Sequence, residues 1–343
     1  MRPFQPVSDP AIRVGGLIES RALSAQARLL RVVMRYAVKT RVHADPDIAR
    51  IRRSVERLAA IALDQPFGVA RRAATVGGRS AEIHTFGREP DRHVLYLHGG
   101  AFVCGSPRTH RGIAGRIARG ARAEVVVLDY RLAPEHPFPA ALEDAEAAYV
   151  GLIERGVDPS RLVIAGDSAG GNLAFALLLK LKGQGGPMPA AAVGLSPFVD
   201  FTASGESFRL NAALDPLLHV NGLPSVVEAY APGADHRNPL LSPIFGDLSG
   251  LPPTLIQCGS DEILLDDARR LHAGLSAAGV PCDLEIWPQM PHVWQAFAIF
   301  LPEGRLALNR INAFLRRIFE SRGDESCGAQ SAPGAPDRNR PAA

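Results

Sequence analysis

Short apolar runs alternate with longer amphipathic stretches between about residue 73 and residue 315. The short runs are rich in β-branched and other apolar residues and predict strands, whereas the stretches between them have the spacing of helices. Strand-helix alternation is typical of a mostly parallel sheet that helices cover on both faces. We count about eight strands, among them the runs at residues 93–97, 124–128, 161–165, 191–195, 253–258 and 282–287.

Two segments do not belong to this alternation. Helical patterns occupy residues 17–40 and 45–61 before the first strand, and a helical insertion occupies residues 200–230. We therefore divide the chain into an N-terminal helical segment, a catalytic domain that contains the insertion, and a tail rich in Gly, Pro, Ser and charged residues that is expected to be disordered. The boundaries are residues 1–63, 64–320 and 321–343.

The first helical pattern is basic and amphipathic. An apolar stripe is flanked by six cations, and such a helix can lie on an anionic membrane. The reading we favour is a cap helix with a solvated basic face. The apolar stripe is Leu23, Leu29, Leu30, Val33 and Met34, and the cations are Arg21, Arg28, Arg31, Arg35, Lys39 and Arg41.

The stretch Gly166-Asp167-Ser168-Ala169-Gly170-Gly171 lies between a predicted strand and a predicted helix. A G-x-S-x-G turn in that context exposes a serine hydroxyl at a helix N-terminus, and the flanking glycines let strand and helix approach closely. The amide of Ala169 and the helix dipole then favour negative charge beside Ser168.

A second glycine-containing loop, His98-Gly99-Gly100-Ala101, follows the strand at residues 93–97. Two glycines leave no side chain between their amides and a substrate oxygen, so we expect Gly99 and Gly100 to join Ala169 in an oxyanion hole. We interpret His98 as a residue that orders this loop by hydrogen bonding.

A nucleophilic serine needs a base, and the base needs an orienting carboxylate. Asp261 follows the strand at residues 253–258, and His292 follows the strand at residues 282–287, which is the chain order expected in this kind of fold. We choose Asp261 as the orienting acid and keep its neighbour Glu262 as the alternative. The other histidines, including His110, are interpreted as structural or surface residues.

Together these motifs resemble the hormone-sensitive-lipase family of α/β-hydrolases, in its bacterial carboxylesterase branch. The residues that carry the resemblance are His98 to Phe102, Asp129 to Ala140, Gly166 to Gly171, Asp261 and His292. It implies an α/β-hydrolase fold with a mostly parallel eight-stranded sheet and a helical cap over the site. Ala101 departs from the pattern, because many members of the family have a third glycine there. The segment from Asp129 to Ala140 is interpreted as scaffold, with Asp167 and His98 as supporting residues of the site.

The resemblance implies a serine carboxylesterase that acts on small ester substrates with short to medium acyl chains and needs no cofactor. Three alternatives stay open. The same triad can hydrolyse amides or arylformamides, since the fold does not set the leaving group. A lipase active at an interface is the second, with the basic helix as its hint. A non-catalytic ligand receptor is the third, but it predicts a lost triad member, and Ser168, Asp261 and His292 are all present.

Composition bears on the partners of the protein and on its location. A formal net charge of +3 does not indicate a nucleic-acid partner, and no apolar run approaches the ~20 residues that cross a bilayer. The first residues lack the pattern of a signal peptide. The four cysteines have neither paired spacing nor a histidine partner for a metal, so we expect reduced thiols, no metal and a cytoplasmic protein. A homodimer is neither indicated nor excluded.

Overall fold

The protein contains one mixed sheet of eight strands, as expected. The computed structural model describes residues 23–39, 47–62, 66–87 and 90–328. The strand order is β1-β2-β4-β3-β5-β6-β7-β8, with β1 and β4 antiparallel to β2 and all other pairs parallel. The strands are β1 (Val69–Val76), β2 (Arg79–Phe86), β3 (His93–Leu97), β4 (Glu124–Leu128), β5 (Leu162–Asp167), β6 (Ala191–Leu195), β7 (Thr254–Gly259) and β8 (Cys282–Trp287).

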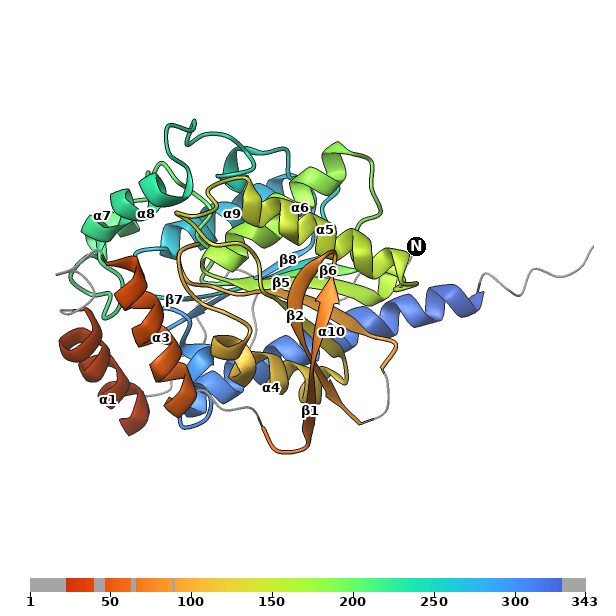
Figure 1. The fold of residues 1–343 in the computed structure, drawn as a ribbon, viewed down its shortest axis with the longest axis horizontal. Helices are drawn as coiled ribbons and strands as arrows, with labels where there is room; N and C mark the ends of the chain where they lie inside the picture. Colours follow the sequence, from red (N-terminus) through yellow and green to blue (C-terminus); the bar gives the residue numbers. More distant parts are fainter. Residues whose placement is uncertain (1–22, 40–46, 63–65, 88–89, 329–343) are drawn as a thin grey trace, which may run out of the picture.

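Helices cover both faces of the sheet (Figure 1). One face carries α5 (Ala140–Glu154), α6 (Ala169–Gly183) and α9 (Leu265–Ala277), and the other carries α4 (Arg111–Ala121) and α10 (Pro302–Gly328). Four short helical turns lie in the loops of this part of the chain: η2 (Arg108–His110), η3 (Pro159–Arg161), η5 (Pro243–Phe245) and η6 (Trp294–Phe297).

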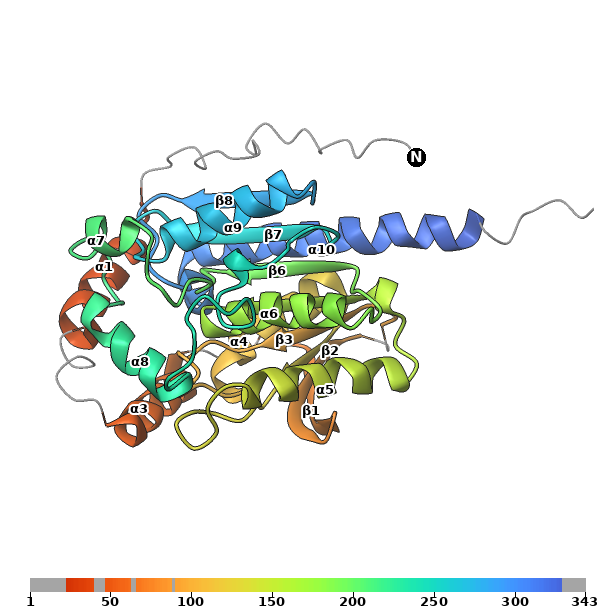
Figure 2. The ribbon, with the colours of Figure 1, turned by 90° about the horizontal axis from the view of Figure 1, so that it is seen from above.

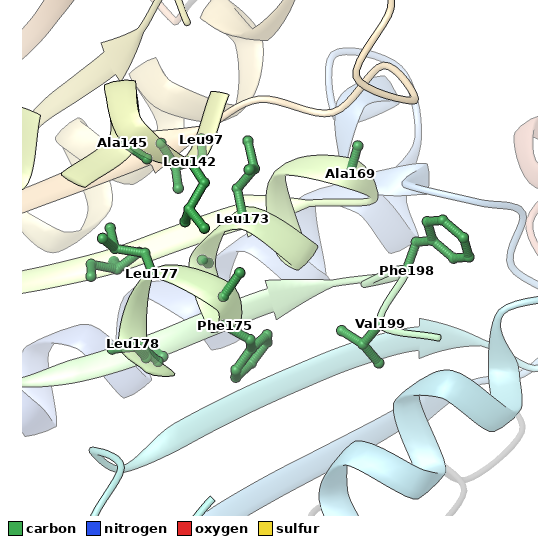
Figure 3. Packing of buried hydrophobic residues seen from close by; sticks show 14 of the residues in the cluster. Leu97, Leu142, Ala145, Ala169, Leu173, Phe175, Leu177, Leu178, Phe198 and Val199 are labelled. Atoms are coloured by element: carbon green, nitrogen blue, oxygen red, sulfur yellow. The ribbon is translucent and has the colours of Figure 1, made fainter. Parts of the chain in front are cut away.

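The two-sided core explains why the central strands are apolar throughout. Successive side chains of a strand point to opposite faces, so Leu95 and Leu97 join the cluster under α5 and α6, while Val94 and Tyr96 join the cluster under α4 and α10. Figure 3 shows the first cluster, where Leu97 of the sheet meets Leu142 of α5 and Leu173 of α6.

The register aligns the strand ends that matter for chemistry. Gly166 lies opposite Leu97, Leu195 lies opposite Asp167, and Trp287 lies opposite Gly259. Because these strands are parallel, the loops that follow them leave the sheet at the same edge. Four segments are therefore neighbours. They are the glycine loop (His98 to Ala101), the serine turn (Ser168), the acidic turn (Asp261 and Glu262) and the histidine loop (288–293).

The segments expected to form a cap are helical. They are α1 (Ala25–Val33) with the π-helical turn η1 (Met34–Lys39), α3 (Ile48–Ala62), α7 (Ser207–Leu210), η4 (Val220–Gly222) and α8 (Leu223–Tyr230). Figures 1 and 2 show α1, α3, α7 and α8 gathered at one end of the molecule. The division into separate units stays a prediction. At the C-terminus α10 continues to Gly328, so the boundary placed at residue 320 falls inside a helix, and the remainder of the predicted tail lies outside the described residues.

The orientation of α1 differs from the expected solvated basic face. Ala27, Leu30 and Met34 are buried against Trp287, Met290 and Trp294. The cations on the flanks of this buried row bind the rest of the protein: Arg31 reaches Asp261, Arg35 donates to the carbonyls of Ala213 and Leu214, and Lys39 donates to those of Ala212 and Asp215. The exposed side of α1 and η1 carries an apolar row, with Leu29 64% and Tyr36 70% exposed next to the exposed Val32 and Val33, and Arg28 is exposed beside it. None of the described helices combines the length and the apolar character that crossing a membrane requires.

Candidate active site

Ser168 occupies a sharp turn between β5 and α6, as the sequence predicts. Its φ of 54° and ψ of −119° are strained for a residue with a side chain, and the helix begins at the next residue. A Cβ atom on Gly166 would lie 2.2 Å from the carbonyl oxygen of Gly170, and one on Gly170 would lie 2.0 Å from that of Leu97. The two glycines are therefore required for the approach of strand and helix.

One of the two oxyanion donors expected in the glycine loop is available and the other is not. The amide of Gly99 donates to Oδ1 of Asp167 at 3.0 Å, so the prediction that Gly99 offers a free donor is wrong. In the described part of the chain the amides of Gly100, Ala101 and Ala169 donate no hydrogen bond. The loop turns back sharply, with positive φ at Gly100, Ala101 and Phe102. The Ala101 amide is thus available as a donor, although Ala101 stands where many members of the family have a third glycine.

Asp167 is the buried anchor of this loop. Besides the Gly99 amide it accepts a hydrogen bond from the Tyr96 hydroxyl at 2.8 Å, and Nε2 of His110 lies 3.2 Å from its Oδ1. Burial is the largest single effect and would raise the pKa of Asp167 and lower that of His110. Their mutual charge attraction and the hydrogen bonds of both groups together outweigh it, so the pKa of Asp167 is lowered and that of His110 is raised. The supporting role expected of Asp167 therefore depends on His110, one of the histidines interpreted from the sequence as structural or surface residues.

His98 orders the loop and is unsuited to act as a base. Its ring is buried and stacks on Tyr130 with centroids 4.2 Å apart, and its Nδ1 lies 2.8 Å from the Gly99 carbonyl oxygen. The Tyr130 hydroxyl donates to the His98 carbonyl at 2.7 Å, which gives the segment from Asp129 to Ala140 its supporting contact. Burial lowers the pKa of His98 to about 3, so the ring is neutral at physiological pH.

His292 is paired with Glu262. Its Nδ1 lies 2.8 Å from Oε2 of Glu262, and both side chains are buried. The other oxygen, Oε1, accepts hydrogen bonds from the Gly259 amide at 2.6 Å and from the Ser196 hydroxyl at 2.7 Å. Burial disfavours a charged imidazole, but the hydrogen bond and the charge of Glu262 outweigh it, and the pKa of His292 is raised above its usual value.

The prediction that Asp261 orients His292 is wrong. After β7 the chain turns, and the Glu262 side chain folds back onto the amide of Gly259, which directs it toward His292. The preceding side chain points the other way, because Oδ2 of Asp261 lies 2.7 Å from Nη2 of Arg31 and Oδ1 accepts a hydrogen bond from Ser260. The alternative named from the sequence, Glu262, is the residue that contacts the imidazole.

Ser168 and His292 are linked through the turn that follows β6. The amide of Ser168 donates to the Leu195 carbonyl at 2.9 Å, and Oγ of Ser196 accepts from the amide of Val293 at 3.4 Å while donating to Glu262. Among the described residues neither the Ser168 hydroxyl nor Nε2 of His292 makes a hydrogen bond. Catalytic hydrogen bonds often form only when substrate is bound, so this arrangement is compatible with a nucleophile and its base.

The described residues offer no group of three or more His, Cys, Asp or Glu side chains that could hold a metal ion. The thiols of Cys104, Cys258 and Cys282 are free and buried. Burial raises the pKa of Cys104 to about 11, so this thiol beside the glycine loop is protonated and behaves as a small apolar side chain.

Comparison with known proteins identifies the fold and the family. Residues 94–296 match the family model described as alpha/beta hydrolase fold. An acetyl-hydrolase of Streptomyces hygroscopicus is 48% identical over 242 residues, which are 71% of this chain and 81% of that protein. An esterase of Acinetobacter venetianus is 40% identical over 222 residues, 64% of this chain and 73% of that protein. The crystal structure of an esterase from the bacterial hormone-sensitive lipase family is 44% identical, covers 87% of this chain and 100% of that one, and superposes with a TM-score of 0.83. The chain therefore belongs to the α/β-hydrolase fold, within the bacterial hormone-sensitive-lipase family of esterases.

Proposed function

We propose that the protein is a serine carboxylesterase that hydrolyses esters of short to medium acyl chains through Ser168, His292 and Glu262. The observation that carries the proposal is the 2.8 Å contact of His292 with Glu262 at the edge of the sheet where the strained Ser168 lies. A strained serine, an imidazole and a buried carboxylate in this chain order are the parts that acyl transfer needs.

In the first step, Oγ of Ser168 attacks the ester carbonyl carbon while Nε2 of His292 takes the hydroxyl proton. Glu262 holds the proton of the imidazole on Nδ1 and stabilises the imidazolium that forms. Collapse of the tetrahedral intermediate breaks the bond to the alkoxy oxygen, which leaves as the alcohol with the proton from His292.

The amides of Gly100, Ala101 and Ala169 stabilise the negative oxygen of this intermediate. Their lack of other partners in the described chain supports the assignment, as does the position of Ala169 at the N-terminus of α6. Asp167 fixes the loop through Gly99. Water then attacks the acyl-enzyme with His292 again as base, and the carboxylic acid is released from Ser168 without any cofactor.

The preference for shorter acyl chains is supported by the contact between the cap and the glycine loop. Phe102, next to Ala101, stacks on Tyr230 of α8 with ring centroids 3.7 Å apart, and both are buried. Phe201 and Phe138 pack against the same Tyr230 ring. We infer that these buried rings beside the oxyanion loop leave little room for a long acyl group, and the name of the 48% identical relative, acetyl-hydrolase, fits a short one. We place the optimum at about four to eight carbons.

A second candidate is a lipase that works at a lipid-water interface. The exposed apolar row on α1 and η1, formed by Leu29, Val32, Val33 and Tyr36, favours it, because such a row can enter the surface of an emulsion. We also propose that the protein is cytoplasmic, since Cys104, Cys258 and Cys282 form no disulfide among the described residues, as is usual in a reducing compartment.

One assay separates these possibilities. Hydrolysis of p-nitrophenyl esters of increasing acyl length is measured beside an anilide, a formanilide and an emulsified triglyceride. The proposal predicts that kcat/KM rises by a few-fold per carbon, since each buried methylene contributes at most ~0.8 kcal/mol, and then falls. Faster turnover of the anilide or formanilide points to an amidase. Activation by the emulsion above substrate saturation points to the lipase.

A further inference from the structure

Two loops carry the acid and the base of the site, and they are in direct contact. Glu262 lies in the turn after β7, and His292 lies in the loop after β8. The amide of Gln289 donates to Oγ of Ser260 at 2.8 Å, and the amide of Ser260 donates to the Trp287 carbonyl at 2.9 Å. A movement of either loop therefore changes the geometry of the Glu262-His292 pair.

A single guanidinium from α1 spans both loops. Nη2 of Arg31 lies 2.7 Å from Oδ2 of Asp261, the residue before Glu262, and Nη1 of Arg31 donates to the Gln289 carbonyl at 2.5 Å. The pair is largely shielded, with 18% of the Arg31 side chain and 13% of the Asp261 side chain exposed. The planar fork of an arginine fixes two acceptors relative to each other, which a single ammonium cannot do.

The histidine loop needs such a restraint because its backbone is strained on both sides of His292. Gln289 has a φ of 55° and Val293 a φ of 49°. The left-handed region disfavours residues with a side chain by roughly 1–2 kcal/mol, and a β-branched residue such as valine is especially unsuited to it. Strained backbone of this kind persists only where surrounding contacts hold it. At Gln289 those contacts are Ser260 on the amide and Arg31 on the carbonyl.

The helix that presents Arg31 is itself firmly held. Ala27, Leu30 and Met34 pack against Met290 and Trp294, which lie on either side of His292 in the chain. At the start of α1 the amide and hydroxyl of Ser24 both donate to the carboxylate of Glu303 at 2.9 Å. The guanidinium therefore has a fixed position relative to the two loops.

We propose that Arg31 is a positioning residue, which aligns Glu262 and His292 for proton transfer by holding Asp261 and the Gln289 carbonyl together. The N-terminal helix then acts on the chemistry as well as covering the site. This inference rests on the proposed function, since it takes His292 as the base and Glu262 as its orienting acid.

The test distinguishes two roles of the cations on this helical segment. One is to align Glu262 and His292, and the other is only to hold the segment against the rest of the protein. Arg31→Ala is compared with Arg35→Ala, a matched control one turn further on the same helical segment, whose guanidinium donates to the carbonyls of Ala213 and Leu214 instead. With p-nitrophenyl acetate we expect Arg31→Ala to lower kcat by about 10-fold to 100-fold while KM changes by less than about threefold, because misplacing a catalytic group slows the chemical step. Arg35→Ala is expected to keep a kcat close to that of the wild type.

Three further variants complete the design. Arg31→Lys keeps the charge without the fork and is expected to restore part of the lost kcat. Asp261→Asn is expected to lower kcat by less than Arg31→Ala does, and the double variant to be no slower than Arg31→Ala alone, since the two residues act as one unit. Thermal unfolding of each variant tests whether it is folded. If Arg31→Ala does not fold, the kcat values of Arg31→Lys and Asp261→Asn are compared with that of Arg35→Ala instead.

An Arg31→Ala enzyme with wild-type kcat overturns the proposal, and so does an Arg35→Ala enzyme that loses as much kcat. Failure of the proposed function gives a different result. In that case the Glu262→Gln enzyme keeps a wild-type kcat.

Discussion

Oε2 of Glu262 lies 2.8 Å from Nδ1 of His292, while the adjacent carboxylate, that of Asp261, is turned toward Arg31. Two neighbouring acids thus have different tasks. One pairs with the imidazole of His292, and the other pairs with the guanidinium of Arg31 on α1.

This relationship predicts unequal effects of removing the two charges. Glu262→Gln should lower kcat by roughly 10³-fold to 10⁴-fold, since the amide can stabilise the wrong tautomer and does not stabilise the imidazolium. Asp261→Asn should retain at least a hundred times more activity than Glu262→Gln. Steady-state kinetics on one p-nitrophenyl ester compares them, and the reverse ranking would return the orienting role to Asp261.

The pH dependence follows from the raised pKa of His292. A base must be neutral to accept the serine proton, so activity increases as the pH rises through the pKa of His292. The acid limb of kcat/KM should therefore have its midpoint above ~6.5, the value of an unperturbed histidine. In Glu262→Gln the two largest effects that raise this pKa are lost, while burial and the smaller effects of the Asp215 and Asp167 charges remain, so the midpoint of the residual activity should move to lower pH. A midpoint that moves upward in this variant would show that Glu262 does not govern the titration.

Asp167→Asn tests the anchor of the glycine loop. The amide keeps an oxygen for Gly99 and Tyr96 but loses the charge that faces His110. Breaking one side of a buried ion pair destabilises a protein by about 3–5 kcal/mol, so the melting temperature should fall by several degrees. A less firmly held loop should also lower kcat, by about tenfold or more. Differential scanning calorimetry and kinetics measure the two effects, and unchanged values of both would remove Asp167 from the site.

The close approach at the serine turn can be tested with two alanine substitutions in one helix. A Cβ on Gly170 would lie 2.0 Å from the Leu97 carbonyl oxygen, whereas a Cβ on Gly183, at the other end of α6, meets nothing within 4 Å. Gly170→Ala should destabilise the protein by about 3 kcal/mol or prevent folding. Gly183→Ala should be neutral or stabilising by up to about 1 kcal/mol. Denaturant unfolding gives both values, and equal stabilities would mean that the turn has more room than the structure indicates.

The sequence predicts the elements of this fold better than it predicts the directions of side chains. The strand runs, the turn at Ser168 and the position of His292 follow from local patterns, and each is where the pattern placed it. The choice between Asp261 and Glu262 does not follow from them, because it depends on contacts in the folded chain. Glu262 accepts a hydrogen bond from the Gly259 amide, and Asp261 pairs with Arg31, which is far away in the chain.

The same limit applies to the oxyanion loop and to α1. The Gly99 amide is occupied because Asp167 faces it, and a glycine-rich motif contains no sign of that contact. In α1 the cations flank the buried row and bind backbone carbonyls at several positions, while an apolar row is left exposed. A count of apolar and basic positions on the helix cannot distinguish these two faces, since both contain leucine or valine.

The central claim, that Ser168 is the nucleophile, is tested most directly by covalent labelling. The enzyme is treated with a reactive organophosphate, and the modified residue is located by peptide mass spectrometry. We predict one adduct, on Ser168, with loss of activity in proportion to labelling. Ser168→Ala should be folded, unlabelled and slower by about 10⁴-fold or more. An adduct on another serine, or an alanine variant that keeps near-normal kcat, would contradict the account.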